Sequence, residues 1–143
     1  MNTHAVNFNI TEHFKYTEMA CPCCGELLLI TELFEGVDSI EEMRQDLGFP
    51  MVTNSGHRCK SRNKEVAGEE KSMHLLFAWD GKPEHIPGEP DAIWEAKLLS
   101  MWHWFEKRFP DSAGIGIYNS WVHFDPRRQK ARWDYRKTST TIT

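Results

Sequence analysis

The sequence predicts a single α+β domain, because two long stretches have helical periodicity and several short β-rich runs lie between and after them. The chain has 143 residues, of which 40% are hydrophobic, and this length suits one compact domain with little room for a second. We take residues 1–137 as this domain, with residues 1–20 as an extended arm docked on the core. The Ser/Thr-rich end, residues 138–143, is expected to be a frayed tail.

The first long helix is expected over residues 30–47, where apolar residues recur at steps of three and four. Gly48 follows as a stop signal. Gly36 lies inside this stretch and costs about 1 kcal/mol relative to alanine, so a break into two shorter helices near Val37 remains an alternative. Residues 51–55 combine Val and Thr and predict a brief strand.

The middle of the chain is predicted to expose a loop and then return to the core. Residues 56–71 are polar and are expected to form a surface loop, alone or with a short helix. Residues 75–79 are apolar and predict a strand that ends at Asp80 and delivers its carboxylate there. Residues 82–90 hold three prolines, a density that opposes regular structure.

The second long helix is expected over residues 91–109, where the apolar stripe is strongest and acidic and basic residues lie at the ends that the helix dipole favours. Residues 114–118 and 121–125 are β-rich and predict a hairpin around Asn119-Ser120. Residues 126–137 are basic, which is typical of a solvated surface, with attraction to an anionic polymer as the alternative.

Charge and hydropathy restrict the possible partners. The formal net charge is −4 and the pI is about 6.0, which opposes binding to nucleic acid by charge alone. No apolar run approaches the roughly 20 residues that span a bilayer, so we expect no membrane partner. The first ten residues lack the basic-then-apolar pattern of a secretory signal. We therefore expect synthesis in the cytoplasm without an export signal.

Two histidines and one aspartate are candidates for a metal site. His74 precedes the predicted strand that ends at Asp80, and His123 lies in the predicted hairpin. Two imidazoles and one carboxylate are the protein ligands of a catalytic zinc site whose fourth position takes water. The alternative is that each histidine is a hydrogen-bonded structural residue.

The four cysteines raise a separate question. Cys21, Cys23 and Cys24 are clustered, and Cys59 is the only other cysteine. A thiolate zinc site would need all four. Packing, or a disulfide formed after release from the cell, is the preferred interpretation, and a thioredoxin-like motif is disfavoured because no βαβ unit surrounds the pair.

The order of several motifs carries a resemblance to the M15 metallopeptidases. The matching segments are Ser55-Gly56-His57-Arg58-Cys59, Asn63, Ser72-Met73-His74-Leu75-Leu76, Ala78-Trp79-Asp80, Gly114-Ile115-Gly116-Ile117-Tyr118, Val122-His123-Phe124-Asp125, Arg127 and Arg132-Trp133. The resemblance runs from about Phe14 to Trp133. It implies a hedgehog/DD-peptidase-like α+β fold, a small antiparallel sheet with two main helices packed on it. The family cleaves peptidoglycan stem peptides and includes bacteriophage endolysins.

The resemblance implies Zn²⁺ as cofactor and His74, Asp80 and His123 as its ligands, although His74 and Asp80 are one residue closer than is usual in the family. The family places an acidic residue three positions before the second histidine, where this chain has Ser120. Asp125 is then the candidate general base, or the residue that orients His123. Its alternative role is an ion pair with Arg127 or Arg128.

Three further residues are implied to bind substrate. Arg58 matches the arginine that faces the substrate, where a guanidinium can hold a carboxylate or a polarised carbonyl. Ser72 would bind the peptide backbone, and His57 would line the cleft. The alternatives are a solvated loop arginine for Arg58 and a turn-forming serine for Ser72.

The resemblance therefore predicts a zinc-dependent peptidase that acts on the peptidoglycan stem peptide, as a D-Ala-D-Ala carboxypeptidase or as an endopeptidase. The absence of a signal sequence fits a phage endolysin that reaches the cell wall after phage-mediated release. The alternative is a catalytically inactive M15-like module that binds wall peptides or serves as a phage structural adaptor. The oligomeric state is not predicted.

Overall fold

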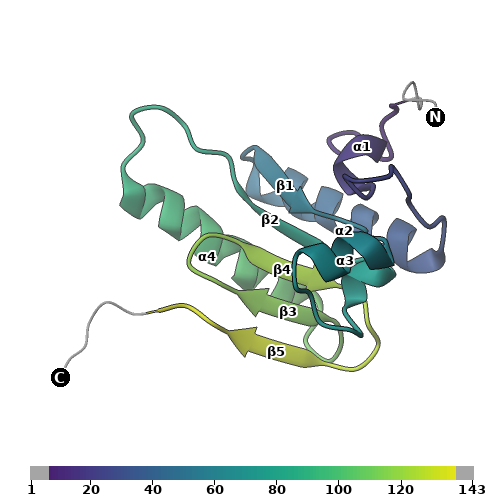
Figure 1. Ribbon diagram of the computed structural model, residues 1–143. Helices are drawn as coiled ribbons and strands as arrows, with labels where there is room; N and C mark the ends of the chain where they lie inside the picture. The colour runs from purple at the N-terminus through teal and green to yellow at the C-terminus, as the bar shows by residue number, and fades with distance from the viewer. Residues whose placement is uncertain (1–6, 138–143) are drawn as a thin grey trace.

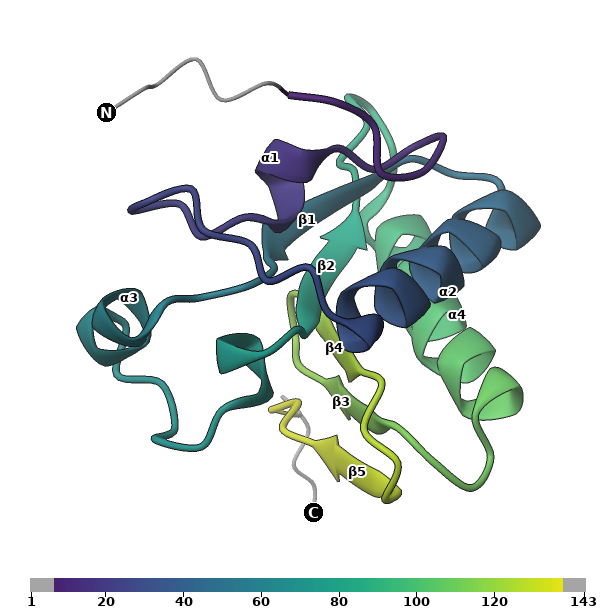
Figure 2. The same ribbon diagram turned by 90° about the vertical axis from the view of Figure 1, so that its right-hand side faces the viewer.

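A computed structural model describes residues 7–137, in which two long helices lie on one face of a five-stranded sheet (Figure 1). In chain order the elements are α1 (Tyr16–Met19), α2 (Thr31–Leu47), β1 (Met51–Ser55), α3 (Lys60–Glu65), the 3₁₀ turn η1 (Met73–Leu75), β2 (Trp79–Pro83), α4 (Asp91–Arg108), β3 (Gly114–Ile117), β4 (Val122–Asp125) and β5 (Ala131–Asp134). Figure 2 shows α2 and α4 together on one side of the sheet and α3 on the opposite side. The predicted α+β class is confirmed.

The sheet has the strand order β1-β2-β4-β3-β5. The pairs β1–β2, β2–β4 and β3–β4 are antiparallel, as expected, and β3–β4 is the predicted hairpin. The pair β3–β5 is parallel, and β5 lies within the basic segment that was predicted as solvated surface. Arg132 fixes this strand in place, because its guanidinium donates to the carbonyl oxygens of Phe109, Ser112 and Ala113.

Helix α2 is continuous, so the predicted break near Val37 does not occur. Gly36 is required for packing: a Cβ added there would lie 2.6 Å from the ring of Phe77. The helix ends at Gly48, whose φ of +77° is left-handed and whose N–H donates to Arg44 O. The propensity cost of the glycine is thus offset by close contact between the helix and the loop before β2.

The hydrophobic core fills the space between the sheet and the two long helices. Trp79, Phe124 and Ile115 are neighbours across β2, β4 and β3, and all three are fully buried. Phe105 of α4 stacks on Phe124 with ring centroids 4.5 Å apart. Because side chains alternate along a strand, the residues between these apolar ones face the other side of the sheet.

That other face carries a second row of neighbours, Asp80 on β2, His123 on β4, Gly116 on β3 and Trp133 on β5. A Cβ at Gly116 would lie 2.1 Å from Trp133 Nε1, so the indole ring lies directly over this glycine. The sheet therefore places a carboxylate, an imidazole and an indole side by side on the face opposite the core.

The predicted strand over residues 75–79 is wrong. Residues Met73–Leu75 form a 3₁₀ turn, and β2 begins only at Trp79 and runs to Pro83, into the stretch expected to lack regular structure. The apolar residues are explained by burial without a strand, because Phe77 is fully buried against α2. Asp80 consequently lies inside the strand and not at its end.

Part of the N-terminal arm packs on the core. Phe14 is buried and its ring meets Trp79 edge-on, with centroids 6.2 Å apart, although the arm also contains the short helix α1, which was not expected. Residues 1–6 and the predicted tail, residues 138–143, lie outside the described residues. No helix within residues 7–137 is long and apolar enough to cross a membrane.

Candidate metal centre

Three side chains from separate segments meet on the face of the sheet opposite the core. Asp80 and His123 are direct cross-strand neighbours, and His74 comes from η1. His123 Nδ1 lies 2.9 Å from Asp80 Oδ1, and His74 Nε2 lies 3.1 Å from Asp80 Oδ2. One ligand atom of each residue lies within 4.8 Å of the others. The shorter spacing between His74 and Asp80 therefore does not separate the three groups.

A backbone carbonyl orients His74. Its Nδ1 lies 2.7 Å from Gly56 O, and because a carbonyl oxygen only accepts, Nδ1 must carry the proton. In the neutral form of the ring, Nε2 is then an acceptor that faces the Asp80 carboxylate, another acceptor. This buried nitrogen has no hydrogen-bond partner within the described residues. A cation between Nε2 and the carboxylate would satisfy both, so the donor set fits a metal ion.

A buried carboxylate orients His123 from the other side of the ring. His123 Nε2 donates to Asp125 Oδ2 at 2.7 Å, which leaves Nδ1 toward Asp80. Asp125 is fully buried, and Arg127 Nε and Nη2 each donate to it at 2.7 Å. Metal-binding histidines in proteins usually have such a carboxylate or carbonyl partner on the other ring nitrogen. Both histidines of this centre have one.

The electrostatics of the centre favour a charged Asp80. Burial raises the pKa of the Asp80 carboxyl, but the two neighbouring imidazoles, His123 first and His74 second, outweigh it and hold that pKa well below its usual range. Burial likewise opposes ionisation of Asp125, whose pKa is lowered because Arg127 and His123 donate to it. The centre thus offers an anionic oxygen ligand, which zinc accepts together with two imidazoles.

Arg58 and Ser72 both lie beside the segments that carry His74. Arg58 N–H donates to His74 O, and its Nε is buried without a hydrogen-bond partner in the described part of the chain. Burial lowers the pKa of this guanidinium, while the charge of Asp80 acts in the opposite direction. Ser72 Oγ accepts the N–H of His74 at 3.1 Å and so begins the 3₁₀ turn, which is the turn-forming role given above as its alternative.

His57 does not line a cleft. Its ring is buried, Nδ1 donates to Leu76 O at 2.9 Å and Nε2 pairs with Glu26 Oε1 at 2.9 Å. Both ring nitrogens therefore have partners, and the ring links its own segment to those that carry Leu76 and Glu26. Neither ring nitrogen is free to contact a substrate, so the structure gives His57 a supporting role and not the predicted cleft-lining one.

Trp133 and Tyr118 belong to the site but were given no role by sequence reasoning. The Trp133 ring lies 5.0 Å from that of His123, and its Nε1 donates to Tyr118 Oη at 3.0 Å. The available signal was the Gly-Ile-Gly-Ile run of β3, because alternating glycines leave one face of a strand open for large side chains from neighbours. Without knowledge of β5, that signal could not identify Trp133.

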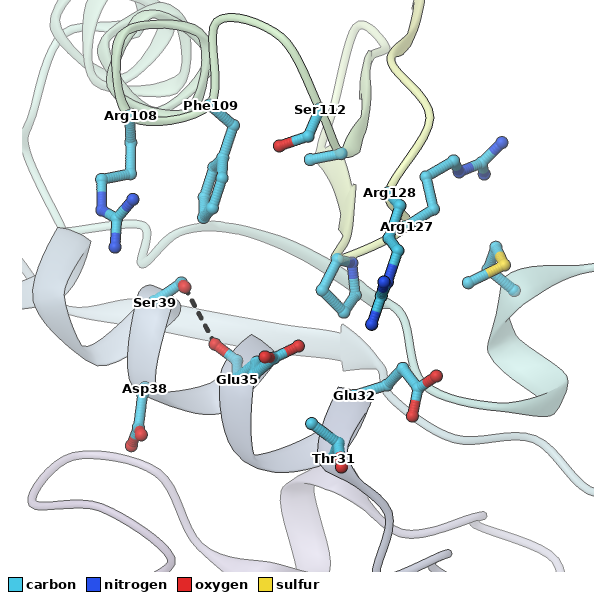
Figure 3. A pocket seen from close by; sticks show the side chains of 13 residues that line it. Thr31, Glu32, Glu35, Asp38, Ser39, Arg108, Phe109, Ser112, Arg127 and Arg128 are labelled. Carbon is cyan, nitrogen blue, oxygen red and sulfur yellow. Dashed lines mark hydrogen bonds between the residues drawn. The ribbon is translucent and has the colours of Figure 1, made fainter.

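A separate pocket lies between α2 and the segment after β4 (Figure 3). Glu32 and Glu35 lie on its α2 wall, and Arg127 and Arg128 lie on the opposite wall. It contains none of the three metal-binding candidates. Its link to the centre is Arg127, which lines the pocket and also holds Asp125.

Comparison with known proteins identifies the family. No curated protein and no solved structure matches the chain. The sequence model of the family described as Peptidase M15 matches residues 12–125, a stretch that contains η1, β2 and β4 with all three candidate ligands. Because this match covers well over half of the 143 residues, the chain belongs to the peptidase M15 family of metallopeptidases.

Proposed function

We propose that this protein is a zinc-dependent peptidase that cleaves peptide bonds in peptidoglycan stem peptides, as a D-Ala-D-Ala carboxypeptidase or as an endopeptidase. The observation that carries the proposal is the unpaired Nε2 of His74, which faces the Asp80 carboxylate 3.1 Å away in a buried site. An arrangement of two acceptors costs free energy unless a cation binds between them. His74, Asp80 and His123 would hold this ion.

Zinc in such a site supplies Lewis acidity, which polarises a carbonyl and makes water nucleophilic near neutral pH. The residues of the chain position the ligands for this ion. Gly56 O and Asp125 hold the two imidazoles in the tautomers that present Nε2 of His74 and Nδ1 of His123. Trp133 lies beside His123, with ring centroids 5.0 Å apart.

Arg58 is the proposed substrate-binding residue. Its Nε is buried and unpaired within the described residues, and desolvation lowers the pKa of the guanidinium. An anionic group from the substrate would relieve this cost by two parallel hydrogen bonds. The stem peptide carries carboxylates, so Arg58 would hold one of them beside the metal. Ser72, which caps η1, would offer its hydroxyl proton to the peptide backbone.

Asp125 is proposed as a positioning residue and not as the general base. Its carboxylate is fully buried and accepts from Arg127 on both oxygens and from His123. A base must reach the reacting water, whereas Asp125 contacts the ring nitrogen of His123 that points away from Asp80. Its contribution is therefore to orient the imidazole.

The test compares wild type with His74→Ala and His123→Ala, with His103→Ala as the matched control. His103 is an exposed histidine on α4. Each protein is incubated with purified cell walls, turbidity is followed, and the released products are identified by mass spectrometry. We expect wild type and His103→Ala to release D-alanine or cleaved cross-links, and both site variants to lose this activity together with one bound zinc.

Retention of activity in either site variant would contradict the assignment of the ligands. A wild type that binds zinc through these residues but releases neither D-alanine nor larger fragments would instead identify a binding module or structural adaptor. The identity of the products separates a carboxypeptidase, which releases free D-alanine, from an endopeptidase, which releases larger fragments.

A further inference from the structure

All four cysteines of the chain come together at a second place, formed by two segments far apart in sequence. Cys21, Cys23 and Cys24 lie in the loop after α1, and Cys59 directly precedes α3. The Sγ atoms of Cys21 and Cys23 are 3.5 Å apart, those of Cys21 and Cys59 are 3.6 Å apart, and those of Cys23 and Cys59 are 3.4 Å apart. All four sulfur atoms lie within 4.8 Å of one another.

These distances match a tetrahedral metal site. A zinc–sulfur bond of about 2.3 Å gives neighbouring sulfurs on a tetrahedron a separation of about 3.8 Å. A disulfide needs about 2.05 Å. The measured distances of 3.4 to 3.6 Å are close to the tetrahedral edge, and all four thiols are free. Packing of an apolar core does not explain the cluster, since Cys23 and Cys24 are exposed.

The backbone turns so that the first three thiols face the same point. Gly25 N–H donates to Cys21 O at 2.8 Å, and Cys21 N–H donates to Glu26 O at 2.8 Å. Gly25 has a φ of +76°, a left-handed value that favours glycine. Cys59 Sγ accepts Arg62 N–H at 3.4 Å. The loop is therefore closed by its own backbone with the thiols directed toward Cys59.

We propose that Cys21, Cys23, Cys24 and Cys59 bind a structural Zn²⁺ ion as four thiolates, separately from the centre formed by His74, Asp80 and His123. Four protein ligands close the coordination sphere, which is typical of structural zinc and leaves no position for substrate. The four thiols lose their protons on binding, and no oxidant is involved.

The position of this site gives the ion a structural task. It joins the loop that carries Glu26 to the segment that carries Arg58 and Gly56. Glu26 pairs with His57, and Gly56 O orients His74. Zinc bound to the thiolates would therefore fix the segment that supports both the substrate arginine and one ligand of the catalytic centre.

The experiment uses the full chain with His74→Ala and His123→Ala combined, purified in a non-chelating reductant with zinc added. We expect this double variant to retain about one zinc per chain, against about two in wild type. An organomercurial that modifies thiols should release the retained ion as four thiols react. Cobalt substituted into the double variant should show the sulfur-to-cobalt charge-transfer absorption of a tetrathiolate site.

A complementary variant combines Cys23→Ser with Cys59→Ser and keeps the histidines. It should hold about one zinc, which an organomercurial does not release, and circular dichroism checks that it folds. The proposal is overturned if the His74→Ala/His123→Ala protein binds no zinc while its four thiols titrate freely. It is also overturned if intact-mass measurement of freshly purified wild type shows two disulfides. Loss of wall cleavage alone leaves these results unchanged, so failure of the peptidase proposal is distinguishable.

Discussion

Replacing Asp125 with asparagine tests whether this carboxylate orients His123 in the candidate metal centre. The carboxylate accepts four hydrogen bonds: from His123 Nε2 and Arg127 Nη2 on Oδ2, and from Arg127 Nε and Arg127 N–H on Oδ1. Asparagine has one oxygen, so its amide group must face two N–H donors. Half of the hydrogen bonds are lost whichever way the amide faces, and the negative charge that holds the His123 imidazole in place is removed.

The magnitude follows from these contacts. A hydrogen bond to a buried charged group contributes about 1.5 to 3 kcal/mol. Part of the loss is offset because the Arg127 side chain is 32% exposed and its N–H groups can bond to water instead. We therefore expect Asp125→Asn to lower the free energy of unfolding by about 3 kcal/mol. Loss of the partner of a metal-binding histidine should weaken zinc binding by about 10 to 100-fold, or about 1.4 to 2.7 kcal/mol.

Asp134→Asn is the matched control. Asp134 has the same two-residue spacing to its arginine and the same paired contacts, from Arg136 Nε at 3.0 Å and Nη2 at 2.6 Å. It is 47% exposed and contacts no histidine in the described structure. An exposed pair of this kind contributes about 0 to 1 kcal/mol, so this variant should stay within that range and keep the zinc affinity of wild type.

Urea unfolding measures the stability of each variant, and competition with a chromophoric chelator measures its zinc affinity. In the zinc assay, each variant is compared with the same variant that also carries His74→Ala. This difference isolates the zinc held by the centre. Equal zinc affinity in Asp125→Asn and wild type would refute the role of Asp125 as a positioning residue. A large fall in turnover at saturating zinc with no change in affinity would instead assign it as the base.

Two further predictions concern packing and pH. Gly116→Ala should displace Trp133, whose Nε1 lies 2.1 Å from the position of the new Cβ. This overpacking should lower the free energy of unfolding by about 1 to 3 kcal/mol. An unchanged urea midpoint together with unchanged tryptophan fluorescence would contradict the prediction. Burial raises the pKa of Glu41, but hydrogen bonds from His13 and other donors lower it to about 2 from an ordinary value of about 4.5. This group therefore stabilises the fold above pH 4.5, and its contribution of up to about 3 kcal/mol is lost as the pH falls toward 2. The difference in unfolding free energy between wild type and Glu41→Gln should shrink over that pH range, and a constant difference would disprove the linkage.

The long helices could be predicted because their apolar residues recur with the helical period. Helix α2 spans Thr31–Leu47 and α4 spans Asp91–Arg108, close to the predicted ranges 30–47 and 91–109. The strand expected over residues 75–79 was wrong because apolar character reports burial and not conformation. Phe77 needed to be buried against Gly36, and a loop does this as well as a strand.

The β5 strand shows what local pattern cannot provide. Its sequence, Ala131 to Asp134, alternates only weakly, and its place in the sheet depends on Arg132 reaching carbonyl oxygens of residues 109 to 113. The metal-binding candidates could be named from their places beside predicted strands and from the order of the motifs along the chain. Their convergence depends on the register of β2 with β4 and on the bond from His74 to Gly56 O, which are long-range features.

The parallel pairing of β5 with β3 has a consequence for synthesis. His74, Asp80 and His123 all leave the ribosome before Ala131–Asp134, and they lie within the family-matched residues 12–125, whereas Trp133 does not. The nascent chain therefore possesses every candidate ligand before it has the indole ring that covers His123. The side of His123 that faces Trp133 is thus completed only by the last strand of the described chain.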